Sequence, residues 1–405
     1  MGAPQSRHPP VRGSGPEFAR LLAAVEAAVT YYRAQLSQTD GPRAYLAQRG
    51  LGVLVRREWP WRVGYAPPDW SALTDHLLAA GFTAEELVGA GLARRTRSDP
   101  NRLIDVFRDR IMFPVRNPAG QAVAFLGRCR PASAVRVPKY INSPRTAIYD
   151  KRHLLFGIAE QQERLSAQWT PVLVEGPADV LAVWLSYSRS GASGAVALAP
   201  CGTTLTDEQA ATLRNLPGAA RGVVAAFDAD PAGSRAVDRA WHLLRKQFPP
   251  GPLLVAEFAA GADPADLLRR PNGRAQLRAA LRRRARPMLD AVLDHRLTRL
   301  VERHPRLLED VDGRCAAVRV LVPLLFQAAS PDDAIRLARR IVATTGAGVD
   351  TVAIAAVAHL EDALHDLDPF TAARGRHGEG RPASRVADQR ADDVRRLGSP
   401  GPART

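Results

Sequence analysis

The stretch RGVVAAFDADPAG, residues 221–233, ends a short apolar run with two aspartates. The apolar run VVAAF is followed by Asp228 and Asp230, with a single residue between them. A continuous apolar run of this length, bounded by glycine and proline, is typical of a strand that is buried on both faces of a parallel sheet. Two carboxylates at the end of such a strand indicate either a turn or a bound cation.

Three other runs repeat this pattern, and stretches with helical spacing separate them. They are TPVLVEG (170–176), GAVALAP (194–200) and PLLVAEF (252–258). Short buried strands that alternate with helices predict βαβ units and an open, mainly parallel sheet. The predicted fold class is therefore α/β, with this sheet occupying residues 166–274.

The segments on either side of the predicted sheet have different patterns. Residues 17–165 predict a mixed α+β subdomain, with an amphipathic helix over 18–36 and strands at RIMFPVRN (110–117) and QAVAFLGR (121–128). Residues 275–365 are rich in Ala, Leu and Arg and predict a helical subdomain. The tails, 1–16 and 366–405, are rich in proline, glycine and arginine and are predicted to be disordered.

Acidic residues follow three of the predicted strands. Glu175 comes after PVLV, Asp228 after VVAAF, and Asp263 after LLVAEFAAGA. Ligands of open α/β sheets bind at the carboxyl ends of the strands, so these side chains are expected to meet there. Oxygen-only ligands favour Mg²⁺ or Mn²⁺, and paired ions of this kind serve phosphate chemistry. The alternative is that the aspartates form turns or begin helices, although Glu175 is a poor turn residue.

The charge balance favours a polyanionic partner. The chain has 405 residues and a formal net charge of +15, and counterion release makes such a protein bind phosphates. An arginine-rich composition without a binding role is the alternative. Only three of the 56 basic residues are lysines, Lys139, Lys151 and Lys246, which suggests that a compact charge is needed where lysine is retained.

Composition also excludes several classes of protein. No apolar run is long enough to cross a membrane, and the first residues have no apolar core typical of a signal peptide, so the chain is expected to be cytoplasmic without a membrane partner. The three cysteines and nine histidines are scattered without the spacing of zinc ligands, so no zinc site is expected.

Four motifs in the second half of the chain resemble the Toprim domain that primases, topoisomerases and some nucleases share. They are VLVEGPADV (172–180), APCGTTLT (199–206), FDADPAG (227–233) and GADPADLL (261–268). The resemblance implies that Glu175 serves acid–base chemistry or metal binding, and that Asp228 and Asp230 hold the catalytic metal. It also implies that Asp179 and Asp263 hold or orient a second ion. Family members have an acid where this chain has Ala265, so Asp266 either replaces that ligand or is a structural residue at a helix start.

Five motifs in the first half resemble the catalytic core of DnaG-type bacterial primases. They are AYLAQRGL (44–51), VGYAPPDW (63–70), FRDRIMFPV (107–115), VPKYINSP (137–144) and LLFGIAEQQ (154–162). The resemblance covers residues 20–365 and implies binding of template, nucleotide or primer by the residues at motif positions: Arg49, Arg108, Arg110, Arg128, Lys139, Tyr140 and Asn142. Leu126 stands where the family has a glycine before Arg128, which puts close backbone approach there in doubt.

These basic residues also have interpretations of their own. A strand through Arg108 and Arg110 would place both on one face, either to bind phosphate or as a solvated surface. Lys139, Tyr140 and Asn142 combine a charge, an aromatic ring and an amide, which suits single-stranded nucleic acid. Tyr140 is alternatively a core aromatic residue with a bonded hydroxyl group.

The resemblance implies a nucleotidyltransferase that makes RNA primers on single-stranded DNA from nucleoside triphosphates, with two Mg²⁺ or Mn²⁺ ions. No zinc-ribbon cysteines and no helicase-binding domain are recognised, so a separate zinc-ribbon protein or a replicative helicase is an expected partner. The alternatives are a Toprim nuclease and a non-catalytic single-stranded DNA-binding factor, which Ala265 favours.

Overall fold

The structure, a computed structural model, describes residues 15–55, 59–130, 138–188, 193–248 and 252–367. Most of the two predicted tails lies outside the described residues. The described residues form two compact units, one within residues 15–305 with 327–334, the other within residues 306–326 with 335–367. The first unit includes both the predicted basic subdomain and the predicted parallel sheet. No helix in the described ranges is long and apolar enough to span a membrane.

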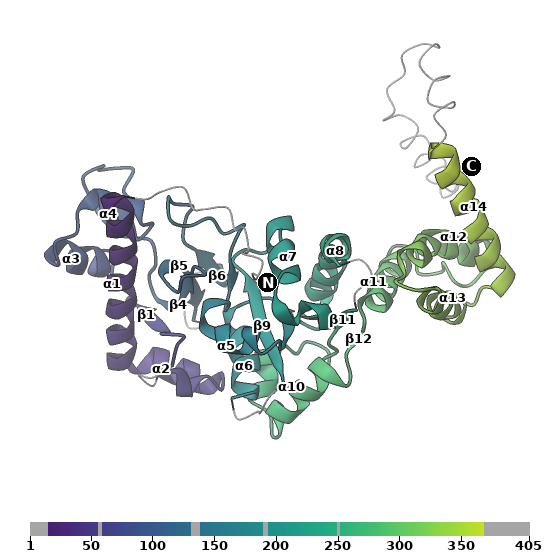
Figure 1. Ribbon diagram of the computed structural model, residues 1–405, viewed down its shortest axis with the longest axis horizontal. Helices are drawn as coiled ribbons and strands as arrows, with labels where there is room; N and C mark the ends of the chain where they lie inside the picture. Colours follow the sequence, from purple (N-terminus) through teal and green to yellow (C-terminus); the bar gives the residue numbers. More distant parts are fainter. Residues whose placement is uncertain (1–14, 56–58, 131–137, 189–192, 249–251, 368–405) are drawn as a thin grey trace, which may run out of the picture. The chain divides into compact units, whose positions relative to one another are not determined.

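A four-stranded antiparallel sheet and a long helix form the N-terminal part of the first unit (Figure 1). Helix α1 (Pro16–Gln38) confirms the predicted helix and packs along β1 and β5. Its buried residues recur at helical spacing, and the ring of Tyr32 meets that of Phe125 edge to face, with centroids 5.3 Å apart. The sheet order is β1-β4-β5-β6, built from β1 (Gly64–Ala66), β4 (Arg110–Arg116), β5 (Ala122–Cys129) and β6 (Tyr140–Asn142).

Short elements surround this antiparallel sheet. They are α2 (Asp40–Gln48), η1 (Gly52–Val55), α3 (Ala72–Ala79), α4 (Ala84–Gly89) and the small hairpin of β2 (Ala93–Arg95) and β3 (Leu103–Asp105). Helix α4 begins with a capping box between Thr83 and Glu86, whose side chains each accept from the other's backbone N–H.

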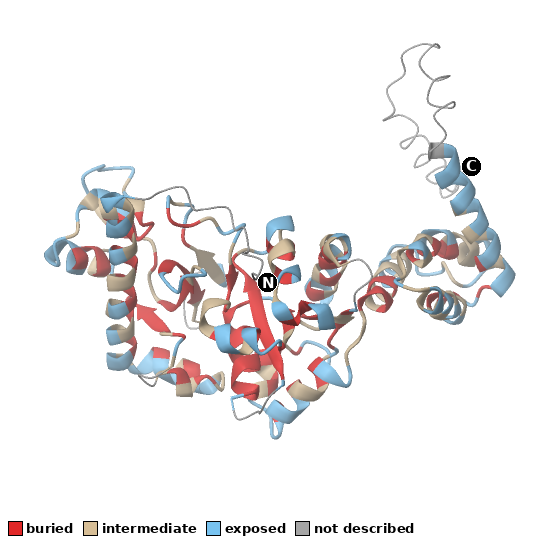
Figure 2. Ribbon diagram, in the orientation of Figure 1, coloured by how far each residue is buried: buried red, intermediate tan, exposed pale blue. Residues whose placement is uncertain are grey.

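A six-stranded sheet with the order β12-β11-β10-β8-β9-β7 forms the centre of the first unit. Its strands are β7 (Leu155–Phe156), β8 (Thr170–Val174), β9 (Ala195–Pro200), β10 (Val223–Ala226), β11 (Leu253–Val255) and β12 (Arg286–Pro287). The four predicted strands are confirmed as β8 to β11 and pair in parallel, while β7 and β12 are antiparallel at the edges. Figure 2 shows this sheet as largely buried, as continuous apolar runs require.

Helices cover both faces of the central sheet. The helices are η2 (Ala159–Gln161), α5 (Gln162–Ser166), α6 (Pro177–Ser186), α7 (Asp207–Arg214), η3 (Pro217–Arg221), α8 (Pro231–Gln247), α9 (Pro264–Leu268), α10 (Gly273–Arg282) and α11 (Met288–Arg303). Helices α6, α9 and α10 pack together, and α8 packs with α7 and α11. The chain leaves β8 for β9 on one side and then returns across β8 to β10, and right-handed crossovers therefore place α6 and α7 on opposite faces.

The reversal of strand order at β8 positions the candidate site. Val174 is in register with Ala226, so the residues just beyond β8 and β10 lie side by side at one edge of the sheet. Ligands of open α/β sheets bind at such a reversal point.

The remaining helices are α12 (Val311–Leu321), η4 (Val322–Gln327), α13 (Pro331–Thr345) and α14 (Val349–Leu367). Residues 275–365 were predicted to be helical, and apart from the two-residue strand β12 the regular elements described there are helices. Helices α10 and α11 belong to the first unit, and the division between the units falls after residue 305, whereas the sequence interpretation placed a helical subdomain from 275.

Candidate active site

A cavity of about 300 Å³ lies between the antiparallel sheet and the carboxyl ends of the parallel strands. Acidic residues line one side of it: Glu175, Asp179, Asp228 and Asp263. Cationic residues line it as well: Arg128, Lys139 and Arg239. The loop 202–204 after β9 contributes a further part of the wall. A cavity with both a carboxylate cluster and cations suits a ligand that carries both metal ions and phosphates.

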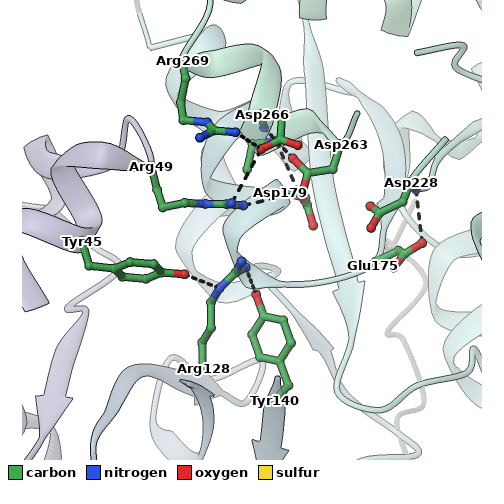
Figure 3. A network of polar contacts seen from close by, with 11 residues as sticks. Tyr45, Arg49, Arg128, Tyr140, Glu175, Asp179, Asp228, Asp263, Asp266 and Arg269 are labelled. Atoms are coloured by element: carbon green, nitrogen blue, oxygen red, sulfur yellow. Dashed lines mark hydrogen bonds and ion pairs between the residues drawn. The ribbon is translucent and has the colours of Figure 1, made fainter. Parts of the chain in front are cut away.

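Glu175 and Asp228 follow the adjacent strands β8 and β10, as predicted, and their carboxylates lie close together (Figure 3). The backbone N–H of Asp228 donates to Glu175 Oε1 over 3.2 Å. Burial, then the charges of Glu175 and Asp263, raise the pKa of Asp228 to about 7. A divalent cation would relieve the repulsion between these neighbouring carboxylates.

Asp179 lies in the first turn of α6 and is only 7% exposed. Burial, then the charges of Asp263 and Asp228, raise its pKa to about 8. Its Oδ1 accepts a long hydrogen bond of 3.4 Å from the N–H of Ala265, which brings α6 and α9 together at the cavity. The cluster thus extends from Glu175 through Asp228 to Asp179 and Asp263.

Asp230 and Asp263 each cap a helix. Asp230 Oδ1 accepts from the N–H of Gly233 at 2.7 Å and begins α8, while Asp263 Oδ1 accepts from the N–H of Asp266 at 2.5 Å and begins α9. Helix capping, the alternative for these aspartates, therefore holds for both, although Asp263 also faces the cavity. Asp266 accepts from Arg269 at 2.5 Å, so its carboxylate is engaged by its own helix.

The four cavity carboxylates suit a hard cation in chemistry, but the side chains are not gathered around one point. Within the described ranges, no set of three acidic, histidine or cysteine side chains is arranged to hold a metal ion. In the same part of the chain, no ion pair to Glu175, Asp179 or Asp228 is present. Lys139 lowers the pKa of both aspartates, but burial and the neighbouring carboxylates raise it by more. The oxygen-only donor set fits Mg²⁺ or Mn²⁺ in its chemistry.

Gly233 is required for the position of Asp228. A Cβ atom at residue 233 would lie 1.9 Å from the carbonyl oxygen of Asp228, far inside contact distance. The first turn of α8 therefore packs directly on the backbone that carries the carboxylate, which only glycine permits.

Arg128 lies in the wall of the cavity that the antiparallel sheet forms. It is 8% exposed, and its Nε donates to the Tyr45 hydroxyl at 2.8 Å and its guanidinium to the Tyr140 hydroxyl at 2.7 Å (Figure 3). The Tyr140 ring packs on Gly176, where a Cβ would lie 3.4 Å away, and burial raises the pKa of Tyr140 to about 12. Tyr140 is thus partly buried with a bonded hydroxyl group. Leu126 lines the cavity beside Arg128 without displacing it.

Arg108 and Arg110 do not share a strand face. Strand β4 begins at Arg110, because Asp109 has a left-handed backbone with φ of 47° that interrupts the extended chain. Arg110 is 6% exposed and donates to the carbonyls of Gly127 and Pro138, which tie the neighbouring segments together. The expectation of a common strand face is therefore wrong.

Arg108 instead stacks on an exposed aromatic ring. Its guanidinium lies 4.1 Å from the ring centroid of Trp70, which is 57% exposed, and it donates to the Asp105 carbonyl at 2.6 Å. Asp105 is buried and accepts from the N–H groups of Leu73 and Thr74, so the pair is built on a fixed turn. Arginine over tryptophan makes a flat cationic surface.

The other residues predicted to bind nucleic acid or nucleotide are Lys139, Asn142 and Arg49. Lys139 lines the cavity. Asn142 donates to the carbonyl of Cys201 at 2.5 Å and so positions the loop that follows β9. Arg49 reaches the carboxylates of Asp263 and Asp266, each at 3.6 Å.

Sequence reasoning missed Arg239, Trp70 and Tyr45 as individual residues. Arg239 lines the cavity together with Ala236 and Leu243 of α8. These residues are three and four positions apart, so helical periodicity places them on one face of the helix. Tyr45 and Trp70 lie inside recognised motifs. The partner of Tyr45, Arg128, is distant in sequence, and the partner of Trp70, Arg108, lies outside the regular elements.

Comparison with known proteins agrees with this arrangement. Residues 31–162 match the family described as DNA primase catalytic core, N-terminal domain, and residues 172–268 match the Toprim-like family. The chain is 32% identical to the RNA polymerase domain of Mycobacterium tuberculosis primase DnaG in its crystal structure, covering 98% of that domain and 80% of this chain with a TM-score of 0.64. This chain belongs to the DnaG primase catalytic core family.

Two further comparisons bear on the DnaG-type core. The chain is 34% identical to the DNA primase of M. tuberculosis over 334 residues, 81% of this chain and 49% of that protein, so it spans about half the length of the curated relatives. A structure described as the DnaG primase catalytic domain bound to ssDNA is 27% identical, with a TM-score of 0.60, and the match covers 82% of this chain and 97% of that one.

Proposed function

We propose that this chain is a primase-type nucleotidyltransferase that makes short RNA primers on single-stranded DNA by metal-assisted phosphoryl transfer. The observation that carries the proposal is the cavity where four carboxylates from β8, α6, β10 and the start of α9 face cations from the antiparallel sheet and α8. The matched relatives named DNA primase, and a primase domain described with bound ssDNA, support the substrate class.

The residues divide into an acidic and a cationic group. Glu175, Asp179 and Asp228 would hold a Mg²⁺ or Mn²⁺ ion, with Asp263 beside them; such an ion offsets phosphate charge and assists attack by a 3′-hydroxyl group. Lys139 and Arg239 would contact the triphosphate, Lys139 through its compact ammonium group and Arg239 through its planar guanidinium group. Arg128 lines the cavity and would act as a positioning residue, because two of its N–H donors hold the hydroxyl groups of Tyr45 and Tyr140.

One assay separates the candidate functions. Incubation with single-stranded DNA, Mg²⁺ and labelled ribonucleotides is expected to give short labelled oligomers. A shortened template would instead show a nuclease, in which water attacks. A retarded DNA band without synthesis would show a non-catalytic binding factor, and either result would overturn the proposal.

Trp70 and Arg108 form the proposed template surface. Burial, then the charge of Arg94, lowers the pKa of Arg108, so a second cation lies near the stack. Trp70→Ala is expected to weaken binding of single-stranded DNA by roughly 5- to 150-fold, since base stacking on an aromatic ring contributes about 1–3 kcal/mol. Fluorescence anisotropy with a labelled oligonucleotide measures this loss. Leu78→Ala removes another exposed apolar side chain from the adjacent α3 and should leave affinity unchanged; equal losses in both variants would contradict the assignment.

The acidic cluster also predicts how stability depends on pH. In the metal-free protein the pKa values of Asp179, about 8, and Asp228, about 7, lie above the unfolded value of about 3.9. The native state therefore holds protons that the unfolded chain has lost, so the free energy of unfolding falls as pH rises from about 4 to about 8 and levels off above the folded pKa values. Urea unfolding in EDTA measures this slope. Asp179→Asn should reduce the slope, and an unchanged slope would show that Asp179 titrates normally.

A further inference from the structure

Arg49 brings a positive charge from the N-terminal part of the unit to the acidic residues of α9. It is the C-cap of α2, and the following Gly50, with φ of 73°, packs against the side chain of Leu268. This turn packs against α9, and the Arg49 guanidinium lies 3.6 Å from the carboxylate of Asp263 and 3.6 Å from that of Asp266 (Figure 3).

Both oxygens of Asp263 have a partner. Oδ1 accepts from the Asp266 N–H, and Oδ2 lies 3.6 Å from Arg49. Asp266 faces Arg49 and also accepts from Arg269. Two guanidinium groups therefore balance these two carboxylates, whereas Glu175, Asp179 and Asp228 have no ion pair within the described residues.

The contact of Arg49 with the acids is electrostatic and loose. A separation of 3.6 Å is too long for a hydrogen bond, and the Nε and one terminal nitrogen of Arg49 are buried without a hydrogen-bond acceptor in the described structure. Buried donors without acceptors are costly, so this guanidinium compensates charge without being locked in place.

We propose that Arg49 is the resident counter-ion of Asp263 and limits the free protein to one divalent ion, held at Glu175, Asp179 and Asp228. The inference rests on the proposed metal-dependent function. A second ion at Asp263 would lie beside the guanidinium and be repelled by it, so it requires Arg49 to leave. Ala265 lies between Asp263 and Asp266 in the sequence and offers no additional carboxylate.

The test is a titration of the full chain with Mn²⁺ in the absence of nucleotide, with free Mn²⁺ followed by electron paramagnetic resonance. Wild type is expected to bind one ion and Arg49→Met two, because Met keeps the length of the side chain without its charge. Arg49→Lys, which retains the charge, should stay at one ion. Arg269→Met is the matched control: among the described contacts Arg269 pairs with Asp266 alone, so its loss leaves Asp263 covered and the count at one.

Two ions bound to wild type, or one ion bound to folded Arg49→Met, would overturn the role of Arg49. Circular dichroism checks folding, and a second ion on Arg49→Lys would also count against the proposal. Primer synthesis is measured in parallel. If wild type binds two ions and makes primers normally, only the role of Arg49 is overturned. If wild type binds no ion, the metal-dependent function is overturned as well.

Discussion

Asp228→Ala is expected to abolish primer synthesis while DNA binding persists. Asp228 follows the strand next to β8, its carboxylate lies close to that of Glu175, and its pKa of about 7 reflects burial and the neighbouring carboxylates. Even outer partners of metal ligands typically contribute about 10- to 100-fold, so loss of a direct ligand should reduce synthesis by more than about 100-fold. Removing a negative charge beside a polyanion does not weaken its binding.

Three measurements on the same preparation check this result: synthesis of labelled oligomers, anisotropy of a labelled template, and heat of Mn²⁺ binding. Asp207→Ala is the matched control, because Asp207 is an exposed acid in the first turn of α7, and it should behave as wild type. Primers made by Asp228→Ala at the wild-type rate would remove Asp228 from the site.

Gly233→Ala is expected to reduce synthesis by roughly 100-fold, the loss that a displacement of about 1 Å at a catalytic group produces. Helix propensity alone predicts the opposite, since alanine in a helix is up to about 1 kcal/mol more favourable than glycine. The steric term decides, because the new Cβ would meet the Asp228 carbonyl at 1.9 Å and the start of α8 must move away from the carboxylate.

Gly348→Ala is the control for this substitution, since a Cβ there has its nearest neighbour at 3.8 Å. Synthesis rates and thermal unfolding of both variants separate displacement of the site from general destabilisation. Wild-type synthesis by a stable Gly233→Ala protein would show that α8 accommodates the methyl group without disturbing Asp228.

The central sheet was predictable because its strands are buried on both faces. TPVLVEG and VVAAF have few alternatives to a buried strand, and once parallel pairing is assumed, Glu175 and Asp228 must come out at one edge. The meeting of these two carboxylates follows from topology, and local pattern was sufficient to find it.

Other site residues depend on geometry that local pattern does not encode. Asp230 and Asp266 have the same chemistry as Asp228, but they engage the first turn of α8 and Arg269 respectively. Arg110 is indistinguishable from Arg108 in sequence, and only the positive φ of Asp109 separates the buried Arg110 from the half-buried Arg108. Arg239 required knowledge of which face of α8 meets the cavity.

The contacts across the cavity have a mechanical consequence. Tyr140 lies against Gly176, and Asn142 is bonded to the carbonyl of Cys201, so strand β6 is fastened to the ends of both β8 and β9. In the proposed primase, these contacts oppose relative movement of β6 and the carboxyl ends of β8 and β9. After each nucleotide addition, the hybrid of template and product would then translocate across a surface that these contacts hold in place, without a swing of the cationic wall.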